Sequence, residues 1–146
     1  LVECADMTTR IMDVGAGDIM ERAGRFGAID PLLWGALLQA LSAAAAYRRE
    51  VGPIVEKDAA LNFIFLSSTF PRSIKYFVRE TRKELMRLNN HDLTIRAVER
   101  LRRRLTRLDA EHFTSGELHD YIDDFQLQLT SLDAAIQATW FSWENT

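Results

Sequence analysis

The chain has 146 residues, of which 47% are hydrophobic and 27% charged, with only three prolines and one cysteine. These values are typical of one globular domain, which we place over residues 1–146, and they exclude an intrinsically disordered chain. Because Cys4 is the single cysteine, an internal disulfide framework is excluded, and we expect a reducing, cytoplasmic compartment.

The charges are distributed unevenly along the chain. The formal net charge is −3, but Lys and Arg far outnumber Asp and Glu between Phe70 and Arg107, and the acidic residues dominate elsewhere. Such polarity bears on partners and on the steering of charged ligands, and it carries no information about the fold.

The first predicted element is a helix over residues 1–13. Its apolar residues recur on one side at about 100° per residue, and Glu3, Asp6, Arg10 and Asp13 gather on the other. The spacing predicts that Arg10 bonds Asp6, Asp13 or an acidic group of another helix. Two interpretations stay open for this face: a solvated charged surface, or a polar network held between packed helices.

Two glycines follow, Gly15 and Gly17, and they are predicted to end this helix. Asp18 is then expected to cap a short helix that reaches about Arg25.

The segment from Asp30 to Tyr47 is predicted to be a single helix at the centre of the molecule. It carries no charge after Asp30, and a helix that is apolar nearly all round must be covered on most sides. Asp30 is the expected N-cap and Pro31 the first helical residue. The side with Gly35, Gln39, Ser42 and Ala46 is flat enough for another helix to come close. A membrane span is excluded because it needs about 20 predominantly apolar residues.

The rest of the chain reads as further helices. Gly52-Pro53 is a break, residues 57–66 form a short buried helix, and Pro71 is expected to begin a helix that ends near Leu88. Asp92 is expected to cap the next helix, and Thr114 with Glu117 has capping-box spacing before a long helix to about Trp143. We therefore predict an all-α fold, a bundle of about six helices around the central apolar one.

Two successive predicted helices each present a basic stripe, which we expect to share one partner surface. Its residues are Arg72, Lys75, Arg79, Arg96, Arg100, Arg103 and Arg107. The arginine row has no interleaved aromatic residues for base stacking and the pI is about 5.6, so nucleic acid is disfavoured. We expect an acidic protein surface as the partner, and a plain solvated face is the alternative.

No spacing typical of a catalytic or metal site is present, so the sequence predicts no catalytic residue, metal or cofactor. His91, His112 and His119 are interpreted as loop or surface residues, and Asp120, Asp123 and Asp124 as the solvent face of the last helix. Cys4 has no well-placed base in the sequence pattern and is not expected to be a nucleophile.

Three stretches together resemble the bacterial alpha-E family: VECADMTTRIMDVGAG, WGALLQALSAAAAYRR and NFIFLSSTFPRSIKYFV. The family motif typically reads Glu-Arg-Ala-Asp-Met-Thr-x-Arg, followed by an apolar pair and Asp. One departure is that Cys4 stands where the family has the Arg of its Glu-Arg pair. The positions that carry the resemblance are Glu3, Asp6, Thr9, Arg10, Asp13, Tyr47, Arg48, Phe70, Pro71 and Arg72.

The resemblance implies an all-helical protein that serves a bacterial peptide synthesis or modification system, beside ATP-grasp ligases and transglutaminase-like proteins. Our leading hypothesis is a non-catalytic accessory or scaffold module. The alternatives are an enzyme that uses Glu3 or Asp6 as acid or base, and a nucleic-acid-binding helical protein. Because family members are typically duplicated and this chain begins at Leu1, we expect a C-terminal portion of a longer protein. Apolar surface on the first helix or beside Leu127 would then favour homo-oligomers.

Overall fold

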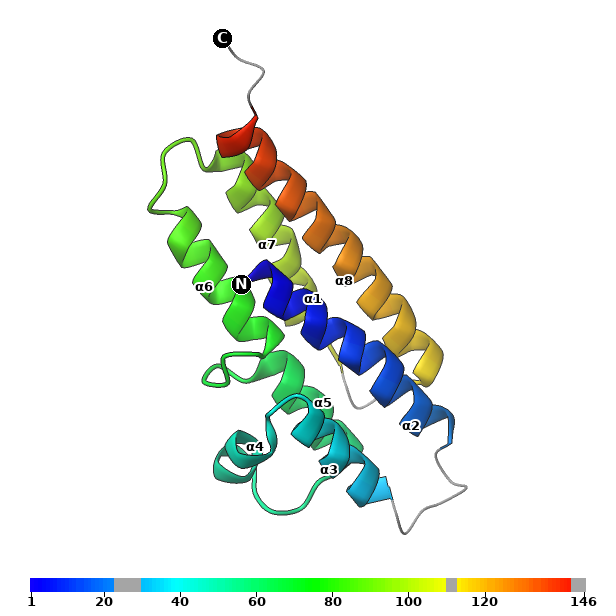
Figure 1. Cartoon of the computed structure of the whole chain (residues 1–146). Coiled ribbons are helices and arrows are strands. Elements are labelled where there is room, and N and C mark those ends of the chain that lie inside the picture. Colours follow the sequence, from blue (N-terminus) through cyan, green and yellow to red (C-terminus); the bar gives the residue numbers. More distant parts are fainter. Residues whose placement is uncertain (23–29, 110–112, 143–146) are drawn as a thin grey trace.

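The computed structural model describes residues 1–22, 30–109 and 113–142, and these form helices and loops with no strand. The prediction of an all-α fold is confirmed. The helices line up as long rods that lie side by side with alternating direction (Figure 1). The first rod consists of α1 (Val2–Ile11), a π-helical turn η1 (Met12–Ala16) and α2 (Gly17–Glu21), which follow one another without a break.

The second rod joins α5 (Lys57–Leu66) to α6 (Ile74–Leu85) through a tight turn. The third is α7 (Asp92–Thr106), and the last is α8 (Ser115–Ile136), which continues into a second π-helical turn, η3 (Gln137–Phe141). α6 packs on α1 and α7, and α8 packs on α7 and α1, so the rods close into a ring. The architecture is an up-and-down helical bundle.

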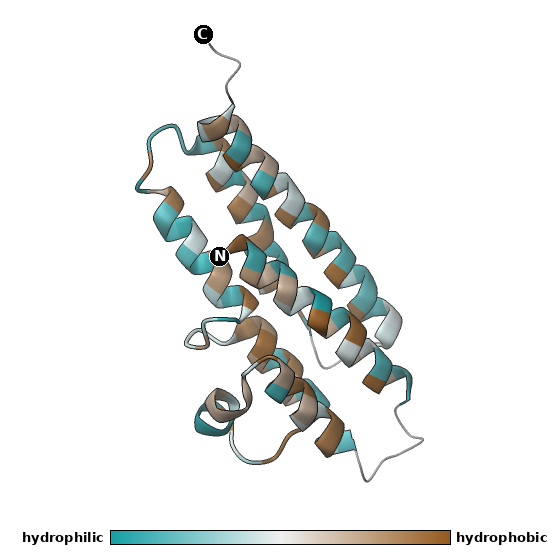
Figure 2. Ribbon diagram, viewed as in Figure 1, coloured by the Kyte–Doolittle hydropathy of each residue, from teal (hydrophilic) through white to brown (hydrophobic). Residues whose placement is uncertain are grey.

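The core fills the space between the rods, because each rod turns an apolar face inward (Figure 2). Burying one such side chain contributes about 1.5–3 kcal/mol, so a long stripe such as that of α8 fixes its helix firmly. The side chains that are almost fully buried include Met12, Leu61, Ile64, Phe65, Ile74, Leu101, Leu118, Ile122 and Phe125. None of the described helices combines the length and low charge of a membrane-crossing segment.

The prediction of one central helix from Asp30 to Tyr47 is wrong in two respects. The segment forms two helices, α3 (Asp30–Ala40) and α4 (Ala44–Glu50), beside one end of the bundle (Figure 1). α3 covers α5 with only one side, and Leu32 on its outer side is 72% exposed. The side with Gly35 contacts no helix either, since a Cβ added there would have no described atom within 4 Å. The most buried of these short helices is α5.

The break between α3 and α4 is stabilised by contacts from distant parts of the chain. Ser42 has a φ of 55°, a left-handed conformation that costs a residue with a Cβ about 1–2 kcal/mol. The guanidinium of Arg72 donates a hydrogen bond to the Leu41 carbonyl at 3.2 Å, which satisfies a backbone group that the ended helix leaves open. The turn also buries Tyr47 against Phe63, with ring centroids 5.4 Å apart.

The prediction that Gly15 and Gly17 end the first helix is also wrong, and Asp18 lies inside α2 instead of capping it. Gly15 serves close packing: a Cβ at this position would lie 2.6 Å from the Cδ1 atom of Leu37 on α3. The glycine therefore marks the contact between two helices and not a helix end. Arg25, the predicted end of the next helix, lies outside the described residues.

Two helix starts differ from the prediction by a few residues. α6 begins at Ile74 and not at Pro71, because Ser73 is its N-cap and accepts a hydrogen bond from the Tyr76 N–H at 3.1 Å. α7 is preceded by His91 as N-cap, and Asp92 is its first residue. The predicted α5 range and the Thr114–Glu117 capping box are confirmed. Trp143 and His112 lie outside the described residues.

Candidate functional site

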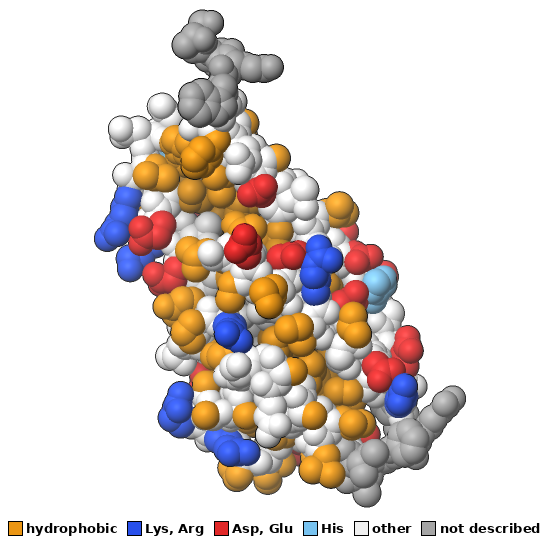
Figure 3. Space-filling view, viewed as in Figure 1, with side chains coloured by type: hydrophobic (Ala, Val, Ile, Leu, Met, Phe, Trp, Pro, Cys, Tyr) orange, Lys and Arg blue, Asp and Glu red, His pale blue; other side chains and the backbone are white. Residues whose placement is uncertain are grey.

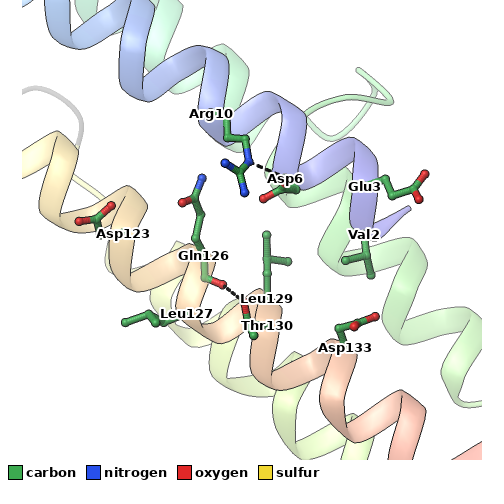
Figure 4. Close-up of a pocket in the computed structure, with 10 residues that line it drawn as sticks. All are labelled: Val2, Glu3, Asp6, Arg10, Asp123, Gln126, Leu127, Leu129, Thr130 and Asp133. Atoms are coloured by element: carbon green, nitrogen blue, oxygen red, sulfur yellow. Dashed lines mark hydrogen bonds and ion pairs between the residues drawn. The ribbon is translucent and has the colours of Figure 1, made fainter.

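The charged side of α1 borders a groove between α1 and α8, which we call the motif groove (Figure 4). α1 turns Ala5, Thr8 and Thr9 into the core, so its charged residues face α8 and the solvent. The groove has a volume of about 660 Å³. Its lining residues are Val2, Glu3, Asp6, Arg10, Asp123, Gln126, Leu127, Leu129, Thr130 and Asp133.

The charged residues that line the motif groove are mostly acidic. Asp6 and Glu3 from α1 face Asp123 and Asp133 from α8, and Arg10 is the one basic residue among the lining residues. In the space-filling view, acidic side chains gather where α1 meets α8 (Figure 3). A concave surface lined by one sign of charge concentrates ligands of the opposite sign, so this groove favours a cationic group.

Arg10 and Asp6 form an ion pair on the groove's outer edge, as the sequence predicted. The Nε atom of Arg10 donates to Asp6 Oδ2 at 2.8 Å, and this hydrogen bond and the charge of Asp6 raise the pKa of Arg10. The Arg10 side chain is 68% exposed, so solvent screens the pair and it adds little to stability. Glu3 is exposed and has no ion pair or hydrogen bond with another described residue.

The polar contacts that cross between α1 and α8 use other residues. The buried Thr9 hydroxyl accepts a hydrogen bond from Gln126 Nε2 at 3.3 Å and lies 3.0 Å from the backbone carbonyls of Ala5 and Asp6. Arg10 therefore belongs to a solvated charged surface, which is the first of the two interpretations of this face. Thr9 and Asp13, one turn later, make polar contacts with α8, as the second interpretation expects.

Asp13 lies in η1 and contacts His119 of α8. Their closest atoms, Asp13 Oδ1 and His119 Nδ1, are 2.7 Å apart, and Asp123 Oδ2 lies 3.4 Å from His119 Nε2. The hydrogen bond to Asp13 is the main cause that raises the pKa of His119, followed by the charges of Asp13 and Asp123. A protonated imidazole donating to two carboxylates fits this arrangement.

The same three residues form a candidate cation site, which the sequence did not predict. One ligand atom from each of Asp13, His119 and Asp123 lies within 4.8 Å of the others. To bind a metal ion, the His119 ring must be neutral and must give up its contact with one carboxylate. The raised pKa of His119 favours the protonated ring and therefore opposes metal binding. Asp13 and His119 are 106 positions apart, so no local spacing could have identified the cluster.

The remaining family positions lie outside the motif groove. Tyr47 is buried and donates from its hydroxyl to the Ile54 carbonyl at 2.8 Å, and Phe70 stacks on Phe63 with centroids 5.2 Å apart. Pro71 and Arg48 are exposed. Arg72 donates to the Leu41 carbonyl at the α3–α4 break, so the contacts that Tyr47, Phe70 and Arg72 make are contacts that hold loops in place.

The turn between α5 and α6 also contains a polar cluster that the sequence analysis missed. Glu50 Oε2 accepts hydrogen bonds from the hydroxyls of Ser67 at 2.7 Å and Thr69 at 2.9 Å. The Ser67 hydroxyl in turn accepts from the Phe70 N–H at 3.1 Å. The cluster fixes the end of α4 to the turn, and nothing in the spacing of these residues indicated it.

Cys4, the departure from the family pattern, does not belong to the motif groove. It is half-buried and is absent from the residues that line the groove. Cys4 therefore contributes no side chain to the lining of the groove.

The predicted basic surface is divided by α7 into two grooves. Lys75 and Arg79 of α6 line one of about 770 Å³ between α6 and α7, together with Arg82, Lys83 and Arg102. Arg100, Arg103 and Arg107 line another between α7 and α8. Arg96 is exposed and lines neither, and Arg72 lies apart at the α3–α4 break.

The fold and these sites define a class of protein: a helical bundle whose surface carries charged grooves between neighbouring helices. The chain belongs to the Alpha-E family, described as a predicted alpha-helical domain with a conserved ER motif, whose model matches residues 1–141. The resemblance found in the sequence is thereby confirmed. Neither the curated proteins nor the solved structures gave a match.

Proposed function

We propose that this chain is a non-catalytic accessory or scaffold module of a bacterial peptide synthesis or modification system. Its partners would be an ATP-grasp ligase and a transglutaminase-like protein, as the family resemblance implies. The observation that carries the proposal is the acidic motif groove, a recognition surface of about 660 Å³ between α1 and α8.

The chemistry of the groove supports binding over catalysis. Asp6 is held by Arg10, and the hydroxyls of Thr9 and Thr130 lie against backbone carbonyls, so no described hydroxyl of this groove is activated by a base. Carboxylates arranged along two helices suit a Lys side chain, an Arg side chain or a free amine of a peptide substrate. The groove would hold such a peptide while a partner enzyme performs the reaction.

The test is an assay of ATP-dependent peptide ligation by the partner enzymes, with and without the full-length protein. We expect stimulation of the partners and no reaction by the protein alone. A triple variant, Glu3→Gln, Asp123→Asn and Asp133→Asn, should lose the stimulation. A matched control with three changes of the same type at exposed sites elsewhere, Glu56→Gln, Glu84→Gln and Asp92→Asn, should retain it. Product formed by the protein alone would favour the enzyme hypothesis and contradict the scaffold.

Exposed apolar side chains also support the proposed tendency to self-associate. Met7 and Val14 on the first rod are 62% and 74% exposed, and Leu127 on α8 is 67% exposed. Light scattering at increasing concentration tests this, and a monomer at every concentration would contradict it.

A further inference from the structure

A second hollow lies on the flank of α8 that faces α7, and we call it the arginine pocket. It has a volume of about 520 Å³. Its lining residues are Arg100, Arg103, Arg104 and Arg107 from α7, and Tyr121 and Gln128 from α8. The motif groove lies along the other flank of α8, so the two sites are independent surfaces.

The charge of the arginine pocket is strongly positive. Four guanidinium groups line it, and the carboxylate paired with them is Asp124, whose Oδ2 lies 2.6 Å from Arg104 Nη2. Guanidinium groups stay charged at any physiological pH, and their planar fork of donors matches the oxygens of a phosphate. The excess positive charge therefore indicates an anionic ligand.

Three polar atoms of the pocket's lining residues are buried without a hydrogen-bond partner in the structure. They are Arg104 Nε, the Tyr121 hydroxyl oxygen and Gln128 Oε1. Leaving a buried polar atom unpaired costs free energy, and few such atoms are tolerated in folded proteins. Three unpaired polar atoms among the lining residues of one pocket indicate hydrogen-bonding groups that a ligand would satisfy.

The Tyr121 side chain is held rigidly in this position. Its ring contacts Phe65 and Phe113, each with centroids 5.6 Å away, and the Arg104 guanidinium lies 5.2 Å from its centroid. Burial raises the pKa of Tyr121 to about 12, so its hydroxyl is a neutral donor at physiological pH. Arg104 Nε is a donor as well, and Gln128 Oε1 is an acceptor.

We propose that the arginine pocket binds the phosphate group of a small molecule. A hydrogenphosphate group has oxygens that accept from Arg104 and Tyr121 and one O–H that donates to Gln128. The exposed side chains of Arg100, Arg103 and Arg107 are long enough to close over it. This inference does not rest on the proposed function.

The experiment is calorimetric titration of the 146-residue chain with inorganic phosphate, pyrophosphate and ADP in separate runs at low ionic strength. We expect saturable binding of one molecule per chain by at least one of these probes, and no saturable binding of chloride at the same ionic strength. Tightest binding of inorganic phosphate identifies free phosphate as the ligand class. Tighter binding of pyrophosphate or ADP identifies a diphosphate.

Tyr121→Phe is the decisive variant because it removes the hydroxyl and keeps the packed ring. We expect the variant to be at least as stable to heat as the parent, since the buried hydroxyl has no partner in the unliganded chain, and to bind the phosphate probe about tenfold more weakly. A merely structural Tyr121 would leave the affinity unchanged.

A matched pair of charge variants separates the pocket from general electrostatics. Arg100→Gln with Arg103→Gln removes two charges from the arginine pocket, and Arg82→Gln with Arg102→Gln removes two from the groove between α6 and α7. We expect the first pair to weaken binding tenfold or more and the second to change it less than twofold. The proposal would be overturned if both pairs lost affinity equally or if Tyr121→Phe kept the parent's affinity. It would also be overturned if no probe bound saturably.

Discussion

At the scale of single residues, some family positions line a surface groove and others make contacts that hold a loop in place. Glu3, Asp6 and Arg10 border a groove, whereas Tyr47 and Arg72 each donate one hydrogen bond to a backbone carbonyl and hold a turn in place. Substitutions at the two kinds of position should therefore differ in outcome. Changes in the first group should affect binding, and changes in the second should affect stability.

Gly15 and Gly17 offer a matched test of close packing at one residue. Gly15→Ala should destabilise the fold relative to Gly17→Ala by about 1–3 kcal/mol, because the new methyl group meets Leu37 at 2.6 Å in a well-packed site. Gly17→Ala has open space around its Cβ and helical backbone angles, so it should stabilise the fold by about 0.4–1 kcal/mol. Urea unfolding measures both, and equal stabilities would show that Leu37 moves aside without cost.

His119 is expected to make stability depend on pH near neutrality. Its pKa in the folded chain is raised above 6.5, chiefly by the hydrogen bond to Asp13, with Asp123 and Asp120 adding negative charge. Its stabilising contribution is thus complete below the unfolded pKa and is lost as the pH rises through the folded pKa. Asp18 and Glu21 line the hollow beside His119.

The measurement is an NMR titration of the His119 ring in the parent and in two variants. Asp13→Asn should lower the pKa of His119 towards its ordinary value, and Asp133→Asn, farther along α8, should leave it nearly unchanged. In urea unfolding, the parent's free energy of unfolding should decline above about pH 6.5, and that of His119→Gln should not show this decline. An unaltered His119 pKa in Asp13→Asn would refute the assignment of this hydrogen bond as the cause.

At the scale of elements, long-range contacts decide where helices end. The first helix continues through two glycines because α3 packs against it, and an uncharged, alanine-rich segment breaks at Ser42 because Arg72 and Phe63 stabilise the turn. In both places the local sequence favours the other outcome. Helix propensities differ by about 1 kcal/mol per residue or less, so one buried contact or hydrogen bond can outweigh them.

The break at Ser42 can be tested with one substitution at two sites. Ser42→Gly should stabilise the fold by up to about 1 kcal/mol, because glycine adopts a φ of 55° without strain. The same change in the middle of α8, Ser131→Gly, should destabilise it by about 0.5–1 kcal/mol. Thermal unfolding followed by circular dichroism measures both. Destabilisation by Ser42→Gly would mean that α3 and α4 form one continuous helix in solution.

At the scale of the whole molecule, charge is arranged by surface. The groove between α1 and α8 is acidic, and the two grooves that flank α7 are basic. Surfaces of opposite charge favour ligands of opposite sign, so the acidic and the basic grooves are expected to bind different groups.

We predict that the outer arginines of α7 strengthen association with an acidic surface of the ligase partner. The triple variant Arg96→Glu, Arg100→Glu and Arg103→Glu should weaken binding at least tenfold and flatten its dependence on salt, because the screening length falls from about 10 Å at 0.1 M to about 3 Å at 1 M. Calorimetry with the ligase measures both quantities.

The control for this prediction reverses an equal charge at exposed sites away from α7: Arg22→Glu, Arg49→Glu and Arg87→Glu. It should bind like the parent. If the α7 variant also keeps the parent's affinity and salt dependence, the arginine row serves solubility alone. Tyr121→Phe, which leaves every charge in place, distinguishes this surface from the arginine pocket.

Much of the fold follows from the sequence alone. The apolar periodicity of residues 57–66, the capping box at Thr114 and Glu117, and the stripe of α8 each depend on residues within a few turns of one another, so local pattern determined them. The Arg10–Asp6 pair is local as well, since i and i+4 always share a helix face. Three stretches in the family's order were together sufficient to identify the family.

Only the tertiary structure decided the rest, because the deciding contacts join residues far apart in the chain. Gly15 meets Leu37, Arg72 meets Leu41, and Asp13 meets His119, and none of these pairs has a spacing that a local pattern can reveal. The two grooves beside α7 follow from the same cause. The sequence determined which side of each helix is charged, but the neighbour that each charged side faces depends on how the helices close into a ring.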